Sequence, residues 1–580
     1  HSQELEIQSD DQYQENNVIY ADGNVLVTFK GNSLTADRLI YDKLNAKFDA
    51  FGNIKLIIGK QIFVAEKISY DFKSQKGKLL KVKGLINTNN LFENINIHNS
   101  DPSEISSTFK EIRRIKVLHT PNGVRNWIFS TDELIIENNQ WIAKKAFFTS
   151  DLLETDQVEF RINNLKITPE DESLKIQSAI SFLVLEDKIP IPVWFGKRKL
   201  NTSSNSIEYE PKWFIGTDKL NKDGYFIGRR FNPINLTDDY SLKLEPQFLL
   251  ERSIKGNTKS FVKKGDSVTA KKSKQDTSIE DYFALNSDLK GKVGPWDLRV
   301  KKELYSFDFN KVQDALRINL DLSREIDFLN SKWNKSFYGV YRDRVWNGSI
   351  GESEIYIGYG SKLEKSKSWE VDEINKNEKI SLGFGKFKGE SLNTNNLVDN
   401  YKGSIFYSLD QKFPLIVSQS KDKSIDNSFR YTFEPVKQGI YLDTKLEGLY
   451  SFYEDGNHQK YIGFGVGPEF TIGEFKKKYF DYTRLSLFPF YKLKSGDSVF
   501  KFDQVSDLFT LNLSLHQQLY GPILFKTDAT LNLDSNSDDY GDFINSKISL
   551  FWERRSYQFG LFYQPHNQSG GISFTLYGFE

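Results

Sequence analysis

Apolar and polar residues alternate with a period of two along most of this 580-residue chain. In one such segment, Leu316, Ile318 and Leu320 alternate with polar neighbours. Because successive residues of a strand point to opposite faces, this spacing gathers apolar side chains on one face of a β-strand. Clusters of turn-forming residues, such as 455–457, separate the segments. The pattern predicts an all-β chain.

The hydropathy of the chain excludes a helical membrane protein but allows a membrane barrel. No stretch approaches the roughly 18–20 consecutive apolar residues of a membrane-spanning helix, and the mean hydropathy is -0.52. Strands that alternate lipid-facing and lumen-facing side chains give only a weak hydropathy signal. We therefore expect residues 205–580 to form a large antiparallel transmembrane β-barrel of about 20–26 strands. A soluble β-propeller is the alternative, although no blade-length repeat appears in this region.

Charge and reactive residues argue against several classes of function. A formal net charge of +0 does not fit a nucleic-acid partner, whose footprint would be basic. Without cysteine there is no disulfide, thiolate metal site or thiol nucleophile. The six histidines have no metal-ligand spacing, and no clustered Ser/His/acid set appears. We expect no enzymatic activity, no catalytic residues, no metal site and no cofactor.

An internal repeat occupies the first third of the chain. Residues 21–25 (ADGNV) recur 29 positions later as 50–54 (AFGNI), and 36–42 (ADRLIYD) recur as 65–71 (AEKISYD). The Gly-Asn pair in each copy supplies turn chemistry. A repeat of this length that contains only strands and turns indicates a stacked β-solenoid or a folded-over sheet.

The apolar residues of each repeat share one parity and predict a half-buried face. Two interpretations stay open, a packed core and a groove that binds apolar chains. The candidate lining residues are Val25, Val27, Phe29, Leu39, Tyr41, Ile54, Leu56, Ile58, Ile68 and Tyr70.

These repeats resemble the OstA/LptA-like module, and the whole chain resembles the LptD (OstA/Imp) family of lipopolysaccharide-assembly outer-membrane proteins. Motifs carry the resemblance from residue 18 to near residue 250, among them 127–137, 189–195 (IPIPVWF) and 231–235 (FNPIN). Beyond them the likeness is one of barrel character. Members of that family join module and barrel by disulfides, which this cysteine-free branch cannot form.

The resemblance implies a domain order. It runs from an N-terminal leader (1–17) to a periplasmic OstA/LptA-like β module (18–165), a connection (166–204) and the barrel (205–580) in the cell outer membrane. Since the sequence starts at His1 without a signal segment, we also expect a processed chain.

The function implied by the resemblance is that of a lipopolysaccharide translocon and insertase. The periplasmic module would receive lipopolysaccharide from a periplasmic LptA-like bridge protein, and the barrel would deliver it to the outer leaflet through a lateral opening. Whether an LptE-like plug lipoprotein takes part is left open. The alternative is an outer-membrane channel or receptor with a periplasmic module, which leaves the repeat unexplained.

Proline marks the place where the barrel is expected to open. It has no N–H to donate, so it weakens a strand ladder. The candidates are Pro211, Gly224, Pro233 and Pro246, where Gly224 stands near a position that is often proline in the resembled family. We expect the opening between the first strand, near 207–214, and the last, near 572–579. The alternative is that these prolines only shape turns.

A lysine-rich segment, residues 255–278, contains few apolar residues. We expect it to be a mobile loop, and the resemblance implies that it lies outside the cell. Its ammonium groups could hold phosphate or carboxylate groups of the surface lipid.

Overall fold

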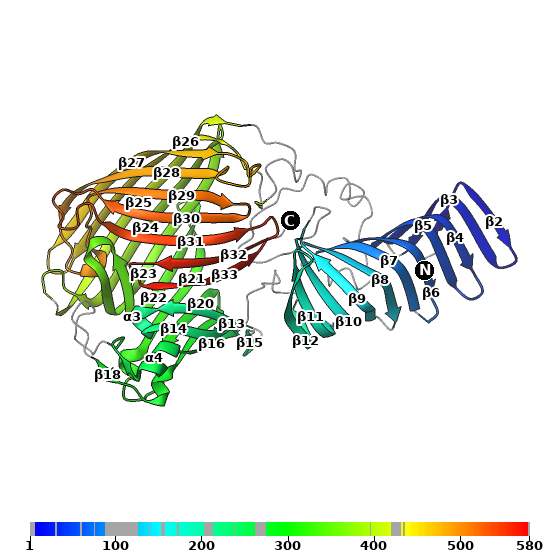
Figure 1. Cartoon of the computed structure of the whole chain (residues 1–580), viewed down its shortest axis with the longest axis horizontal. Helices are drawn as coiled ribbons and strands as arrows, with labels where there is room; N and C mark the ends of the chain where they lie inside the picture. Colours follow the sequence, from blue (N-terminus) through cyan, green and yellow to red (C-terminus); the bar gives the residue numbers. More distant parts are fainter. Residues whose placement is uncertain are drawn as a thin grey trace.

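The computed structural model of the chain has two large β-sheets that follow each other in sequence, and one small two-stranded sheet (Figure 1). It describes residues 6–29, 32–58, 61–74, 76–87, 126–137, 140–151, 157–170, 173–201, 213–231, 233–237, 239–261, 274–394, 396–418, 431–432 and 436–577. The predicted all-β fold class is confirmed. Within these ranges, no helix has the length and apolar character that crossing a membrane requires.

The first sheet, here called the N-terminal module, is antiparallel and has twelve strands. Its strands follow the order of the chain, except that β1 and β2 both pair with β3. They are β1 (Glu6–Gln8), β2 (Asp11–Glu15), β3 (Val18–Phe29), β4 (Asn32–Asp42), β5 (Lys47–Ile58), β6 (Gln61–Asp71), β7 (Lys76–Asn87), β8 (Asn126–Glu137), β9 (Gln140–Thr149), β10 (Val158–Glu170), β11 (Ser173–Leu185) and β12 (Ile189–Asn201).

The Gly-Asn pairs of the repeat were expected to form turns, but they lie inside strands β3 and β5. The ladder between β5 and β6 shifts register between Phe51 and Ile54. There, Gly52 has a φ of +70° and Asn53 a φ of +42°, and Asn53 Nδ2 donates to Asp37 Oδ2 on β4 at 2.9 Å. The pair therefore forms a bulge that bends the strand, since a bulge adds local twist and bend. The first repeat has the same register shift in β3, so the sheet is folded over.

One apolar core fills the inside of the folded module. Its buried members are Ala21, Val25, Val27, Leu34, Ala36, Leu39, Ala50, Ile54, Phe63, Ala65, Ile68, Leu79, Val82, Phe129, Leu134, Trp141, Ala143, Ala146, Leu165 and Ile167. Small residues at the repeated alanine positions let the two halves of the sheet, on either side of the bulges, approach each other closely. The 29-residue repeat thus encodes both the bend and the core.

The second sheet is a closed antiparallel barrel of eighteen strands, with the two-residue β15 as an addition. The strands are β13 (Trp213–Asp218), β14 (Gly224–Arg229), β15 (Ile234–Asn235), β16 (Ser241–Phe248), β19 (Phe283–Val293), β20 (Trp296–Leu304), β21 (Leu316–Phe328), β22 (Ser331–Asn347), β23 (Gly351–Val371), β24 (Ile374–Glu390), β25 (Leu397–Val417), β26 (Gly439–Tyr453), β27 (His458–Ile472), β28 (Thr483–Gly496), β29 (Phe509–Tyr520), β30 (Ile523–Asn532), β31 (Phe543–Glu553), β32 (Tyr557–Gln564) and β33 (Ser569–Leu576).

The barrel has fewer strands than the expected 20–26 because its central strands are long. β23 and β25 each have 21 residues, about twice the length of ten on which the expectation rested. Exposed and buried residues alternate along β27, with Ile462, Phe464 and Val466 on the outside. This apolar exterior is that of a transmembrane β-barrel.

The two ends of the barrel differ. One end, here the module end, carries the turn between β31 and β32 and faces the N-terminal module (Figure 1). The other end, here the far end, carries the short helices α3 (Lys219–Lys222), α4 (Leu250–Lys255), α5 (Val312–Ala315), η3 (Ile279–Tyr282), η4 (Gly348–Ile350) and η5 (Lys501–Asp503), and a small hairpin of β17 (Asn257–Thr258) and β18 (Gln275–Asp276).

Two segment boundaries differ from the expected ones. The sheet of the module continues through β12, so most of the segment 166–204, expected as a connection, forms strands of that sheet. β1 and β2 lie within 1–17, the expected leader, and pair with β3. Only the ends of the lysine-rich segment 255–278 are within the described residues, and its middle, 262–273, lies outside them.

Candidate functional site

The folded module brings most of the predicted lining residues together. Val25, Val27, Leu39, Ile54 and Ile68 are buried in its core, and Tyr41 and Leu56 pack against that core. Tyr70 is half-buried and contacts Phe48. Phe29 and Ile58 end strands β3 and β5, and their side chains lie outside the described residues. The predicted face is therefore the inside of the folded sheet.

Aromatic side chains collect at one end of this apolar interior. Phe72 lies between three other rings, with centroid distances of 5.1 Å to Tyr70, 5.6 Å to Phe48 and 6.5 Å to Tyr41. Phe48 and Phe72 were not among the predicted residues. Phe48 follows a turn at the start of β5 and Phe72 lies in the turn after β6, so an aromatic residue beside a turn was the available signal.

The apolar interior of the module continues into an apolar contact with the barrel. A second cluster joins Trp127, Val158, Leu183 and Leu185 of the module to Tyr557 and Leu576 of the last two strands. Phe148 packs against both this cluster and the core of the module. The apolar surface is therefore continuous from the inside of the module to strand β33.

Two ion pairs surround that contact. Arg555 donates to Asp151 from Nε at 2.9 Å and from the terminal nitrogen at 2.6 Å, and the two side chains are 5% and 1% exposed. The neighbouring Arg554 donates to both carboxylate oxygens of Glu186, at 2.6 and 2.5 Å. Bidentate pairs of this kind fix orientation as well as distance.

Backbone contacts complete this arrangement, here called the junction. Ser150 Oγ donates to the carbonyl oxygen of Tyr577 at 2.9 Å, and the N–H of Ser556 donates to Gln157 Oε1 at 3.3 Å. The junction thus holds β9 to β11 of the module against the turn between β31 and β32. Sequence reasoning did not identify it, and two adjacent arginines in a barrel turn were its only local signal.

The barrel closes through a short ladder, here called the seam. Strands β13 and β33 pair only at Gly216↔Gly571, Thr217↔Gly570 and Asp218↔Ser569. Strands β24 and β25, by contrast, pair over the whole of 375–390. All three seam pairs lie toward the far end. On the module side of Gly571, the described residues of β33 have no ladder partner in β13.

A second short ladder lies on the other side of the hairpin β13–β14. Strand β14 pairs with β16 only at Ile227↔Phe248 and Gly228↔Gln247. The next residue of β16 is Pro246, whose missing N–H removes a ladder donor. The hairpin β13–β14 is therefore joined to each neighbour by only two or three ladder pairs. Beyond Pro246 the chain returns to β16, since the N–H of Phe231 donates to the carbonyl oxygen of Leu244 at 3.0 Å and β15 pairs with β16.

The predicted opening residues fall in or beside this weakly paired region. Pro246 lies in β16 opposite Leu285 of β19, and Pro233 immediately precedes β15. Gly224 begins β14 with a φ of +141°, and a Cβ there would overlap the carboxylate of Glu251. Pro211 lies outside the described residues.

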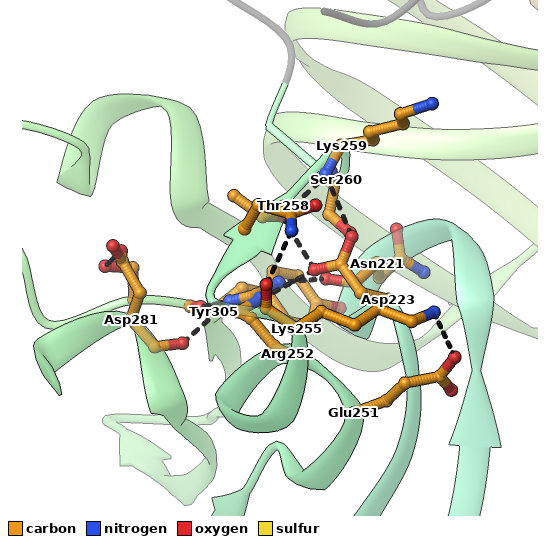
Figure 2. A network of polar contacts seen from close by, with 12 residues as sticks. Asn221, Asp223, Glu251, Arg252, Lys255, Thr258, Lys259, Ser260, Asp281 and Tyr305 are labelled. Carbon is orange, nitrogen blue, oxygen red and sulfur yellow. Dashed lines mark hydrogen bonds and ion pairs between the residues drawn. The ribbon is translucent and has the colours of Figure 1, made fainter. Parts of the chain in front are cut away.

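A network of polar contacts holds the far end of the same hairpin (Figure 2). Arg252 of α4 is fully buried and donates from Nε to Asp223 Oδ2 at 2.6 Å. Its other nitrogens donate to the carbonyl oxygens of Asn221, Asp281 and Tyr305, at 3.0, 3.0 and 2.7 Å. Asp223 also accepts a hydrogen bond from Thr258 Oγ1 at 2.7 Å. The turn of the hairpin is thus tied to α4, β17 and the residues after β20.

Contacts across the barrel interior strengthen this hold. Asn221 Oδ1 in α3 accepts hydrogen bonds from Arg317 on β21 at 2.7 Å and from Arg344 on β22 at 2.8 Å. Strands β16, β19 and β20 separate β14 from β21 in the wall, so these contacts cross the inside. The hairpin β13–β14 is anchored at the far end, and on its β33 side it has no ladder pair between described residues toward the module end.

These features define a class of protein, a closed β-barrel with a folded apolar module docked beside its closing strands. Residues 121–580 match the family described as "Protein of unknown function (DUF3769)". This match covers more than half of the chain, and the chain belongs to that family. Comparison with curated proteins gives no match.

Proposed function

We propose that this protein is an outer-membrane lipopolysaccharide translocon and insertase. The N-terminal module would lie in the periplasm and receive the acyl chains of lipopolysaccharide in its apolar interior. The barrel would then deliver the lipid to the outer leaflet through a lateral opening at the seam.

The observation that carries this proposal is the continuous apolar surface from the module to the seam strand. It runs from the module core through Phe148 to Phe574 and Leu576 on β33. Each acyl CH₂ kept out of water along such a surface contributes about 0.8 kcal/mol. Because the core residues are buried, the two halves of the folded sheet must part to admit acyl chains.

The hairpin β13–β14 is the proposed gate. A closed barrel releases a bulky amphiphile sideways only where its ladders are weak. Here the ladder between β13 and β33 stops short of the module end and the ladder between β14 and β16 is interrupted at Pro246, while Arg252 and Asp223 hold the far end. We expect the hairpin to swing outward from its module end and to pivot at the far end.

The free edge of the module is the proposed docking place for a periplasmic LptA-like bridge protein. Strands β1 and β2 lie at the edge of the sheet, and β3 is their only partner among the described strands. An exposed edge can accept a strand of another sheet by β-augmentation. Stacking the two folded sheets in this way would join their apolar interiors into one path.

Site-specific photocrosslinking in cells tests the proposal. A crosslinker at Leu56, which packs on the module core, should capture lipopolysaccharide. Lys55 is its neighbour on the opposite face of β5 and is the matched control. Capture at Lys55 but not at Leu56 would reject the lipid path. Unimpaired lipopolysaccharide export after depletion of the protein, with loss of a small solute flux, would favour the channel alternative.

A further inference from the structure

We propose a binding site for an anionic phospholipid at the module end of the barrel, on its outer surface between β25 and β28. The ligand would belong to the membrane leaflet that faces the module. This inference rests on the membrane location in the proposed function, but on none of its statements about lipopolysaccharide. The site, here called the rim site, comprises two adjoining cavities and the exposed residues 476–480.

The two cavities differ in polarity. One has a volume of about 360 Å³ and is lined by apolar side chains that include Ile416, Ile440 and Phe470. The other, of about 490 Å³, is lined by Lys476, Lys477, Tyr479, Phe480, Glu474 and Asp481. Both are bordered by Gln438 and Ile472. An apolar groove that leads into a polar pocket matches a molecule with an acyl chain and a charged headgroup.

The apolar groove lies on the outside of the barrel wall. Ile472 has the same parity in β27 as the outward-facing Ile462 and Val466, and it is 63% exposed. Ile416 at the end of β25 is 67% exposed. These side chains extend the apolar exterior of the barrel down to its module end, where the polar loop begins.

The loop between β27 and β28 supplies positive charge at that level. Lys476, Lys477 and Lys478 are consecutive and exposed. Lys476 pairs with Glu474 at 3.0 Å, whereas Lys477 and Lys478 form no ion pair with any described residue. The carboxylates are engaged locally, since Glu474 accepts from Gln438 Nε2 and Asp481 accepts from the N–H of Lys476. Two ammonium groups are therefore available to a phosphate.

Aromatic side chains border the same loop at the surface. Phe480 has a φ of +48°, a left-handed conformation that is unfavourable for a bulky residue, and its ring is 66% exposed. Tyr479 is 63% exposed, and its ring centroid lies 5.0 Å from that of Tyr520. Exposed Tyr and Phe rings next to lysines are typical of a protein surface at the headgroup level of a membrane.

Together these features assign one occupant. The acyl chain of the phospholipid would lie along Ile416 and Ile472, and the phosphate of its headgroup would accept hydrogen bonds from Lys477 and Lys478. Near an anionic membrane surface, each lysine strengthens binding by about fivefold.

The test uses the full chain in nanodiscs that contain phosphatidylglycerol and phosphatidylcholine, with retained lipids counted by native mass spectrometry. Lys477→Gln with Lys478→Gln should lower phosphatidylglycerol retention about 25-fold, from fivefold for each lysine. The control is Lys290→Gln with Lys292→Gln, which removes the same charge. These two lysines of β19 lie on the same face of the strand as the buried Ala284, which is the inner face of the barrel wall, so they do not contact the lipid.

Retention that is equal in the variant, the control and the unmodified chain would overturn the rim site. So would equal retention of phosphatidylcholine and phosphatidylglycerol by the unmodified chain. A barrel that does not insert into nanodiscs at all would instead contradict the membrane location, so the two failures are distinguishable.

A second measurement does not depend on charge. The chain has no native cysteine, so Phe480→Cys can carry a single environment-sensitive fluorophore. In nanodiscs its emission should shift to the blue, because Phe480 is expected at the headgroup level. Leu44→Cys, in a turn of the module where Leu44 is 65% exposed, should show no shift. Emission at position 480 equal to that at position 44 would also overturn the proposal.

Discussion

Arg555 and Asp151 are separated by 404 positions in sequence and form a buried bidentate ion pair between barrel and module. Asp151 follows β9, and Arg555 lies in the turn before β32. Because β32 pairs with the closing strand β33, this pair fixes the module beside the seam.

Removing one partner of this pair should separate module from barrel. Asp151→Ala leaves the Arg555 guanidinium buried without its carboxylate, a change that costs about 3–5 kcal/mol in a buried pair. A double-mutant cycle with Arg555→Ala, measured by chemical unfolding, should give a large coupling energy. The pair Lys332 and Glu325, with side chains 74% and 64% exposed, is the control and should couple by less than about 1 kcal/mol. Equal coupling energies would contradict a structural role for the junction.

Replacing Gly52, the glycine of the bulge in the second repeat, should destabilise the module. Gly52→Ala combines an unfavourable left-handed φ, worth about 1–2 kcal/mol, with overlap between the new Cβ and Asp37. Gly456 in the barrel has a φ of +86° and no atom near its Cβ position, so Gly456→Ala tests the φ effect alone. Unfolding should show a larger loss for Gly52→Ala. An equal loss of stability in the two variants would mean that the overlap of the new Cβ with Asp37 has no energetic effect.

Acid should loosen the turns that follow β4 and β6. Hydrogen bonds from the backbone of Asn45 and Ser74 lower the pKa of Asp42 and Asp71, respectively, below its ordinary value. A lowered folded-state pKa gives stability that is present above the unfolded pKa of about 3.9 and is lost as pH falls through the folded value. Backbone amides in the turn after β6 should therefore be better protected from hydrogen exchange in the native chain than in Asp71→Asn at pH 6. At pH 3 the difference should shrink, and a constant difference would contradict this account.

The sequence predicted the inner face of the module well because that face depends on local spacing. Val25, Ile54 and Ile68 have one parity within a repeat, and strand geometry alone places them on one side. The Gly-Asn pair was assigned to a turn because turns and bulges use the same residues. What distinguishes a bulge from a turn here is the hydrogen bond from Asn53 to Asp37 on the neighbouring strand, a tertiary feature that local sequence does not encode.

The strand number and the junction could not be predicted, for different reasons. Alternation shows that a segment is a strand but does not show where it ends, so the expected number rested on about ten residues per strand, whereas β23 and β25 have 21 residues each. The pairing of Asp151 with Arg555 depends on how the two sheets dock, and nothing local distinguishes these charges from solvent-exposed ones. The short ladder beside Pro246 has a local cause, the missing N–H of proline, but it lies between β14 and β16, whereas the seam strands β13 and β33 contain no proline.

Cutting the anchor at the far end should free the hairpin β13–β14. Arg252→Ala removes four hydrogen bonds from a fully buried guanidinium and leaves Asp223 without its charged partner. Deuterium uptake in 213–229 should rise while uptake in β24 and β25 stays unchanged. Arg299→Ala, which breaks the more exposed pair with Asp288, is the control. Unchanged uptake in 213–229 would show that the far end is held by other contacts.

Closing the unpaired part of the seam should stop lipid delivery. If the ladder of Gly216↔Gly571 continued by one residue, Ile215 would face Ile572. Both side chains are exposed, at 48% and 43%, so cysteines at these positions add no bulk to the lumen. We expect a disulfide between Ile215→Cys and Ile572→Cys to block lipopolysaccharide delivery to the cell surface, and a reductant to restore it.

The control for the seam places a disulfide inside a strong ladder on the same outer face. Leu446 and Phe464 are direct partners in β26 and β27 and are 47% and 50% exposed. A disulfide between Leu446→Cys and Phe464→Cys joins strands that are already fully paired, so delivery should continue. Equal harm from both disulfides would point to a general effect on the barrel. Normal delivery with the seam locked would rule out the hairpin β13–β14 and strand β33 as the gate.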